Sequence, residues 1–98
     1  MTDAPRSEAA IELVTTLKLL RLRARASQFV VSADERVSEC NAARLLEIHR
    51  DALARMRHEG TGPTAYRIAL HGARVTYRLL DLAVWIESRR EKIDINPT

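Results

Sequence analysis

The chain has 98 residues, of which 46% are apolar and 30% are charged, and its formal net charge is +3. This composition is typical of a globular domain and excludes an intrinsically disordered chain. No apolar run approaches the roughly 20 residues of a membrane-spanning helix, so we do not expect a membrane among the partners of this protein.

Apolar residues recur at spacings of three and four, which predicts helices, and no strict alternation indicating strands is recognised. The first helix is predicted over residues 7–31. Ser7 is a good N-cap, and Glu8 and Glu12 are favourable near the positive end of the helix dipole. The predicted buried face of this helix is marked by Leu13, Leu17, Leu20 and Ala24.

The second helix is predicted over residues 33–58. Ser32 and Glu35 have the spacing of a capping box, and Gly60 suits the end of a helix. In an alternative, the first two helices merge into one bent helix. The capping box argues against that alternative.

The third helix is predicted over residues 63–91, because Pro63 suits a first helical turn. Its section 79–86 is apolar on almost every side, so it needs more than one partner surface. The tail 93–98 is expected to be frayed. Short connections make helices antiparallel neighbours, so the predicted fold is all-α: one domain, 1–98, folded as an antiparallel three-helix bundle that self-associates as a dimer.

We recognise no set of catalytic residues in the sequence. The three histidines and the one cysteine lack the spacing of a metal site, and no glycine-rich phosphate loop follows a strand. We therefore expect no enzyme, metal or cofactor. The lone Cys40 cannot form an intramolecular disulfide, and the N-terminus lacks the pattern of a secretion signal, so a cytoplasmic location is predicted.

Nucleic-acid binding is the alternative function. Lys18, Arg21 and Arg25 follow an i, i+3, i+7 spacing and form a basic stripe on the first helix that suits a phosphate backbone. Charges of both signs are interspersed along the chain, however. The three predicted helices also look too long for a helix-turn-helix.

The run from Arg74 to Trp85 resembles the last helix of the alphaproteobacterial regulator of CtrA degradation family. The matched residues are Arg74, Thr76, Arg78, Leu79, Leu82, Ala83 and Trp85. The resemblance implies a dimeric three-helix bundle that acts as an adaptor, helping a ClpXP protease to receive regulatory proteins.

The predicted function is that of a non-enzymatic helical-bundle interaction protein, an adaptor or scaffold in bacterial regulation or regulated proteolysis. Its partners are expected to be a second copy of itself and other proteins. The candidate polar contacts are Arg74, Arg78 and Asp81. The candidate apolar contacts are Leu79, Leu82, Trp85 and Ile86.

Overall fold

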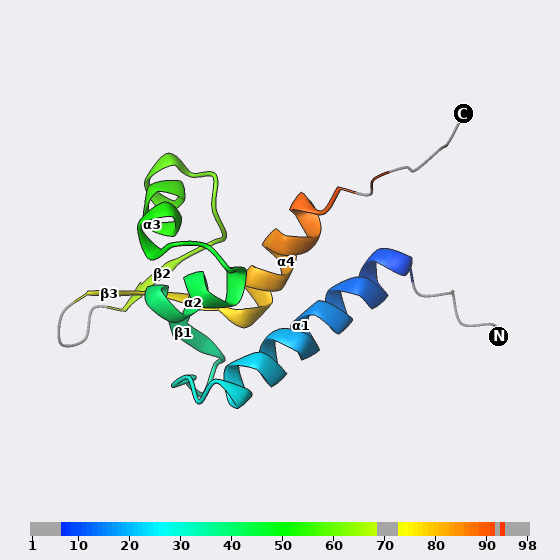
Figure 1. Ribbon diagram of the computed structural model, residues 1–98, viewed down its shortest axis with the longest axis horizontal. Coiled ribbons are helices and arrows are strands. Elements are labelled where there is room, and N and C mark those ends of the chain that lie inside the picture. Colours follow the sequence, from blue (N-terminus) through cyan, green and yellow to red (C-terminus); the bar gives the residue numbers. More distant parts are fainter. Residues whose placement is uncertain (1–6, 69–72, 92, 94–98) are drawn as a thin grey trace.

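The computed structural model describes residues 7–68, 73–91 and 93, and over these it forms four helices and a three-stranded antiparallel sheet (Figure 1). The predicted all-α three-helix bundle is therefore wrong, and the fold is α+β. In chain order the elements are α1 (Glu8–Ala26), β1 (Arg36–Ser38), α2 (Glu39–Leu46), α3 (Arg50–Glu59), β2 (Tyr66–Ile68), β3 (Arg74–Arg78) and α4 (Leu79–Arg89).

Helix α1 begins as the sequence indicates, because the Ser7 hydroxyl accepts a hydrogen bond from the Ala10 N–H at 3.1 Å. It ends at Ala26 and does not continue to residue 31. The Ser27 N–H closes the last turn on the Arg23 carbonyl, and Gln28 then adopts a positive φ of 58°. A left-handed residue directs the chain out of the helix.

The predicted capping box does not start a helix. The Ser32 carbonyl accepts from the Glu35 N–H at 2.9 Å, and the Ser32 hydroxyl accepts from the Arg36 N–H at 2.8 Å. Glu35 has a φ of 62°, which a residue in the first turn of a right-handed helix cannot have. These bonds make a turn that leads into β1.

The two longer predicted helices are each divided. Residues 33–58 contain β1, α2, a turn and α3, whereas the described part of 63–91 contains β2, β3 and α4. In β3 the inward Val75 and Tyr77 alternate with polar residues, and this period of two is that of a strand. The segment 74–85 that carries the family resemblance is thus partly strand and partly helix.

The sheet has the order β1-β3-β2, with both pairs antiparallel. Val37 of β1 lies opposite Tyr77 of β3, and both side chains are fully buried. They join a core to which α1, α2, α3 and α4 also contribute. Its other buried members are Leu20, Ala42, Ala43, Leu53, Leu79, Leu82 and Ala83.

Helix α4 runs beside α1 in the opposite direction (Figure 1). The Thr16 hydroxyl of α1 donates to the Glu87 carboxylate of α4 at 2.7 Å, which satisfies the one buried polar side chain of α1. None of the described helices is long and apolar enough to cross a membrane. The predicted frayed tail, apart from Ile93, lies outside the described residues.

Candidate nucleic-acid interface

Helices α2 and α3 are two short helices joined by a three-residue turn, 47–49. Helix α2 ends because Glu47 adopts the left-handed conformation, with φ 58° and ψ 39°. Helix α3 begins at once, because His49 Nδ1 accepts the Asp51 N–H at 3.1 Å as its N-cap. Ala42 and Ala43 of α2 are buried, and α3 packs against α2. A connection of this length between two packed helices is typical of a helix-turn-helix.

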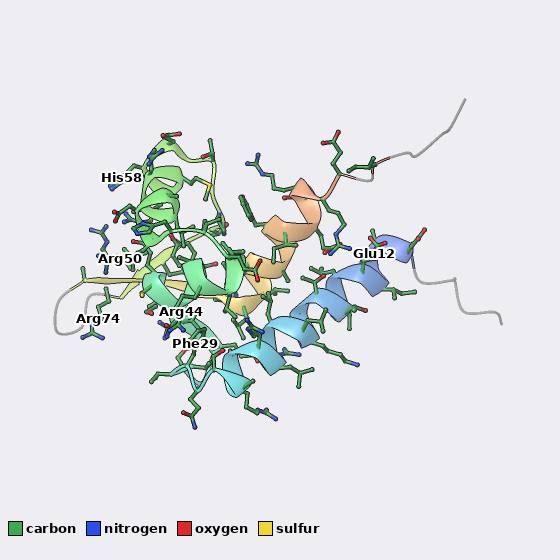
Figure 2. All side chains as sticks on the ribbon, viewed as in Figure 1. Glu12, Phe29, Arg44, Arg50, His58 and Arg74 are labelled. Carbon is green, nitrogen blue, oxygen red and sulfur yellow. The ribbon has the colours of Figure 1, made fainter. Side chains whose placement is uncertain are left out.

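The outward side of α3 carries two arginines and a histidine next to the acidic Asp51 and Glu59, which are exposed as well. Leu53 anchors the inner side of the helix and is fully buried, whereas Arg50, Arg55 and His58 are exposed. Ala54 lies about one helical turn from both Arg50 and His58 and is half-buried. Figure 2 shows Arg50 and His58 at the left-hand side of the molecule, directed away from the core.

A hairpin of β2 and β3 follows α3 and adds further arginines. Arg67 lies opposite Val75, and Arg74 lies opposite Ile68, so the two arginines are on neighbouring strands but their side chains leave opposite faces of the hairpin. Both are exposed. Arg50 and Arg74 lie toward the same end of the molecule in Figure 2. Of the two hairpin arginines, Arg74 is the one that Figure 2 places on the same side of the molecule as the cations of α3.

Many other arginines of the described chain are already paired with a carboxylate. The ion pairs are Arg21–Glu35, Arg36–Asp34, Arg57–Glu39, Arg78–Asp81 and Arg90–Glu87. Among the described residues, no carboxylate forms an ion pair with Arg50, Arg55, Arg67 or Arg74, nor with Arg44 of α2. Arg44 is exposed and has its guanidinium 5.1 Å from the Phe29 ring centroid. A guanidinium group without a carboxylate partner is available to an anionic partner.

Glu39 fixes how α3 sits on the rest of this unit. Its carboxylate accepts from Arg57 Nε of α3 at 2.8 Å and from the Tyr77 hydroxyl of β3 at 2.7 Å. Burial alone would raise the pKa of Glu39, but the hydrogen bonds from Arg57 and Tyr77 outweigh burial, and the pKa lies below its usual value. Burial, and then the Glu39 carboxylate, raise the pKa of Tyr77, so its hydroxyl stays a donor.

The chain matches no protein-family model, no curated protein and no solved structure.

The structure does not gather the apolar candidates from the sequence on one surface. Leu79 and Leu82 are fully buried core residues, and Ile86 packs against the core. Trp85 is half-buried, donates from Nε1 to the Thr61 carbonyl at 3.1 Å, and has the guanidinium of Arg89 5.5 Å from its ring centroid. These contacts join α4 to the rest of the protein.

The three polar candidates separate into two groups. Arg78 donates to Asp81 at 2.8 Å, and its guanidinium lies 5.1 Å from the centroid of the Tyr66 ring. Both Arg78 and Asp81 are thereby engaged within the protein. Arg74, at the far end of β3, belongs to the exposed arginines near α3.

The basic stripe of the first helix is present on α1, but it is incomplete as a phosphate site. Lys18 and Arg25 are exposed. Arg21 makes two 2.7 Å hydrogen bonds to the Glu35 carboxylate and holds the pKa of that group below its usual range. Two of the three predicted cations therefore remain for a ligand, and they lie on a different helix from the arginines of α3.

Sequence reasoning missed the arginines of the helix-turn-helix and of β2: Arg44, Arg50, Arg55 and Arg67. The pattern that would have found them was the pair of short apolar repeats on either side of residues 47–49, followed by the alternation in 74–78. The turn contains neither glycine nor proline, so the sequence of the two short helices was interpreted as that of one long helix.

Proposed function

We propose that this protein binds double-stranded DNA, with α3 in the major groove and the β2–β3 hairpin against the adjacent backbone. The observation that carries the proposal is the outward side of α3. Helix α3 follows a three-residue turn and presents Arg50, Arg55 and His58, which form no ion pair with a carboxylate of the described residues, although Asp51 and Glu59 are exposed beside them. In DNA-binding helix-turn-helix domains, the second helix enters the major groove.

The element order supports the same reading. An antiparallel hairpin directly follows α3 in the chain, so the proposal places helix and hairpin on one duplex. Arg74 of the hairpin, toward the same end of the molecule as Arg50, is suited to a phosphate contact, which fixes position on the duplex without reading sequence. Arg44 on α2, the helix that would cross the backbone, is suited to the same role.

Sequence readout would come from α3. Arg50 stands at the N-terminal end of the helix, the part that contacts base edges in helix-turn-helix complexes. An arginine reads guanine by two hydrogen bonds to O6 and N7, and a methyl group such as that of Ala54 suits the thymine methyl. We place the protein in the cytoplasm as part of this proposal, because bacterial chromosomal DNA lies there.

The test is fluorescence anisotropy with a labelled duplex of mixed sequence at low salt. The double variant Arg50→Ala/Arg55→Ala should weaken binding by at least about tenfold, since two duplex contacts are removed. The matched control is Lys18→Ala/Arg25→Ala, which removes two exposed cations from α1 and should change the affinity far less than the α3 variant does.

The control also tests the alternative predicted from the sequence. If the α1 variant loses affinity and the α3 variant keeps it, the basic stripe of α1 is the nucleic-acid site and the proposal is wrong. If the unaltered protein does not bind the duplex at low salt, DNA binding itself is refuted. The role in protein interaction or regulated proteolysis stays a prediction in either case.

A further inference from the structure

Helix α1 has two apolar sides, and only one of them is covered. Thr16, Leu20 and Ala24 are buried against the rest of the fold. Ile11 is nine residues from Leu20, which places it half a turn around the helix axis. The apolar side chains left uncovered are Ile11, Val14, Leu19 and Leu22, with exposed fractions of 53%, 50%, 60% and 60%.

A surface helix of a monomer usually carries polar residues on the side opposite its buried stripe. Figure 1 shows α1 at the edge of the fold, with α4 beside it. The uncovered side thus faces away from the body of the protein. Exposed apolar residues gathered along one helix indicate a surface that associates with a partner.

The charges along α1 indicate what that partner is. Glu8 and Glu12 occupy the first half of the helix, whereas Arg23 and Arg25 occupy the last turn. All four are exposed, and none forms an ion pair with another described residue. Glu12 and Arg23 are eleven residues apart, very close to three turns at about 3.6 residues per turn, so they project from the same side.

The charges of one α1 helix are complementary to those of a second α1 helix that runs in the opposite direction. In an antiparallel pair, the acidic half of one α1 lies beside the basic half of the other, whereas a parallel pair would bring like charges together. The midpoint between Glu12 and Arg23 falls between residues 17 and 18. The midpoint between Ile11 and Leu22 falls between residues 16 and 17, so one twofold axis serves both pairs.

We infer that α1 pairs in antiparallel fashion with α1 of a second copy of this chain, about a twofold axis near residue 17. Ile11 packs near Leu22 of the partner subunit, and Glu12 pairs with the partner subunit's Arg23, each contact occurring twice. The inference rests on α1 alone and does not depend on DNA binding. It differs from the dimer expected from the sequence, which placed the interface on residues 79–86.

Sedimentation velocity over a concentration series is the first test. The unaltered protein should sediment as a dimer whose fraction rises with concentration, and Leu22→Glu should sediment as a monomer. The matched control is Val84→Glu, at an α4 position with 47% exposure, which should remain dimeric. Circular dichroism shows whether each variant keeps the fold. A monomer at every concentration, or dissociation by Val84→Glu alone, overturns the inference.

Charge reversal tests the register. Glu12→Arg and Arg23→Glu should each weaken dimerisation by about tenfold, because two ion pairs become two repulsions. The double variant Glu12→Arg/Arg23→Glu should recover most of the loss. A double variant as weak as the sum of the single changes would refute the antiparallel arrangement.

The position of Lys18 gives an independent check. Near a twofold axis at residue 17, the two copies of Lys18 approach each other and oppose association, although their long stems let the charges turn toward water. Lys18→Leu should therefore tighten the dimer severalfold. An unchanged or weaker dimer would show that the axis does not pass there.

Discussion

The carboxylate of Glu39 binds groups from α3 and β3 while it stands in the first turn of α2, so one residue connects three elements. Its side chain has 16% exposure, and the Arg57 side chain has 21%. Charge-assisted hydrogen bonds at a largely buried site contribute more to stability than exposed pairs do. The orientation of α3, and with it of Arg50 and Arg55, depends on this residue.

Glu39→Gln should lower the free energy of unfolding by about 1–3 kcal/mol at neutral pH, because Arg57 and Tyr77 lose a charged acceptor. The folded-state pKa of Glu39 is lowered. The charged form therefore stabilises the fold above the unfolded pKa of about 4.3, and this contribution is lost as the pH falls through the folded pKa.

Urea denaturation at several pH values measures both effects. The difference between the unaltered protein and Glu39→Gln should shrink toward zero in acid, where Glu39 is itself neutral. Glu59→Gln, an exposed change at the end of α3, is the control and should have little effect at any pH. A difference that stays constant with pH would contradict the assignment of Glu39.

At this scale the sequence allowed only part of the site to be predicted. Arg74 was identified as a contact residue, but for a protein partner, whereas Arg50 and Arg55 were not identified. The chain is rich in arginine, and sequence does not show which arginines meet a carboxylate in the fold. The ion pair Arg21–Glu35 joins residues that are 14 apart in the sequence. It depends on a turn in which Glu35 is left-handed, and no sequence motif indicates that conformation.

At the scale of elements, the turn between α2 and α3 depends on an unfavourable residue. Glu47 adopts φ 58°, a region that costs a residue with a Cβ about 1–2 kcal/mol and costs glycine little. Glu47→Gly should therefore raise the free energy of unfolding by up to about 1 kcal/mol. Glu47→Ala, which removes the charge but keeps the Cβ, is the control and should bring no such gain.

Thermal unfolding of the two variants is the measurement. A higher midpoint for Glu47→Gly than for Glu47→Ala supports the strain at residue 47. Equal midpoints would show that the left-handed conformation at this turn has no cost. Because Glu47 is exposed and acidic near α3, both variants should also bind DNA slightly more tightly than the unaltered protein.

The sequence predicted helix ends better than it predicted strands. Ser7 and Gly60 were interpreted correctly, because a side-chain N-cap and a left-handed glycine are local devices that act alone. The strands were missed because each is short. The alternation of Val75 and Tyr77 occupies five residues, and it continues directly into the apolar α4, which has a helical period. Strand β1 has only three residues, too few for local propensity to predict it. Its pairing with β3 stabilises the strand.

At the scale of the whole molecule, the two proposed surfaces use separate parts of the chain. The proposed DNA surface lies on α2, α3 and the hairpin, and the proposed self-association surface lies on the outward side of α1. Charges of both signs occur throughout the sequence, but folding pairs many of the cations internally. The exposed arginines without a carboxylate partner among the described residues of the DNA surface are Arg44, Arg50, Arg55, Arg67 and Arg74.

This distribution limits the salt dependence of DNA binding. Each phosphate that a cation neutralises contributes about −0.9 to the slope of log Kobs against log salt concentration, so these arginines give a slope no steeper than about −4.5 per chain. The monomeric variant Leu22→Glu isolates one chain. Its slope should lie at or below that limit in magnitude, and adding Arg74→Ala should reduce the magnitude by about 1.

Anisotropy titrations at a series of salt concentrations give both slopes. A steeper slope for the monomer would mean that further cations, those of α1 included, contact the duplex, and the division of the molecule into two surfaces would be wrong. If the slope of the dimer is about twice that of the monomer, both chains contact one duplex, because each contributes its own set of cations. Equal slopes would mean that the α1 pairing leaves one chain on the DNA and the other free.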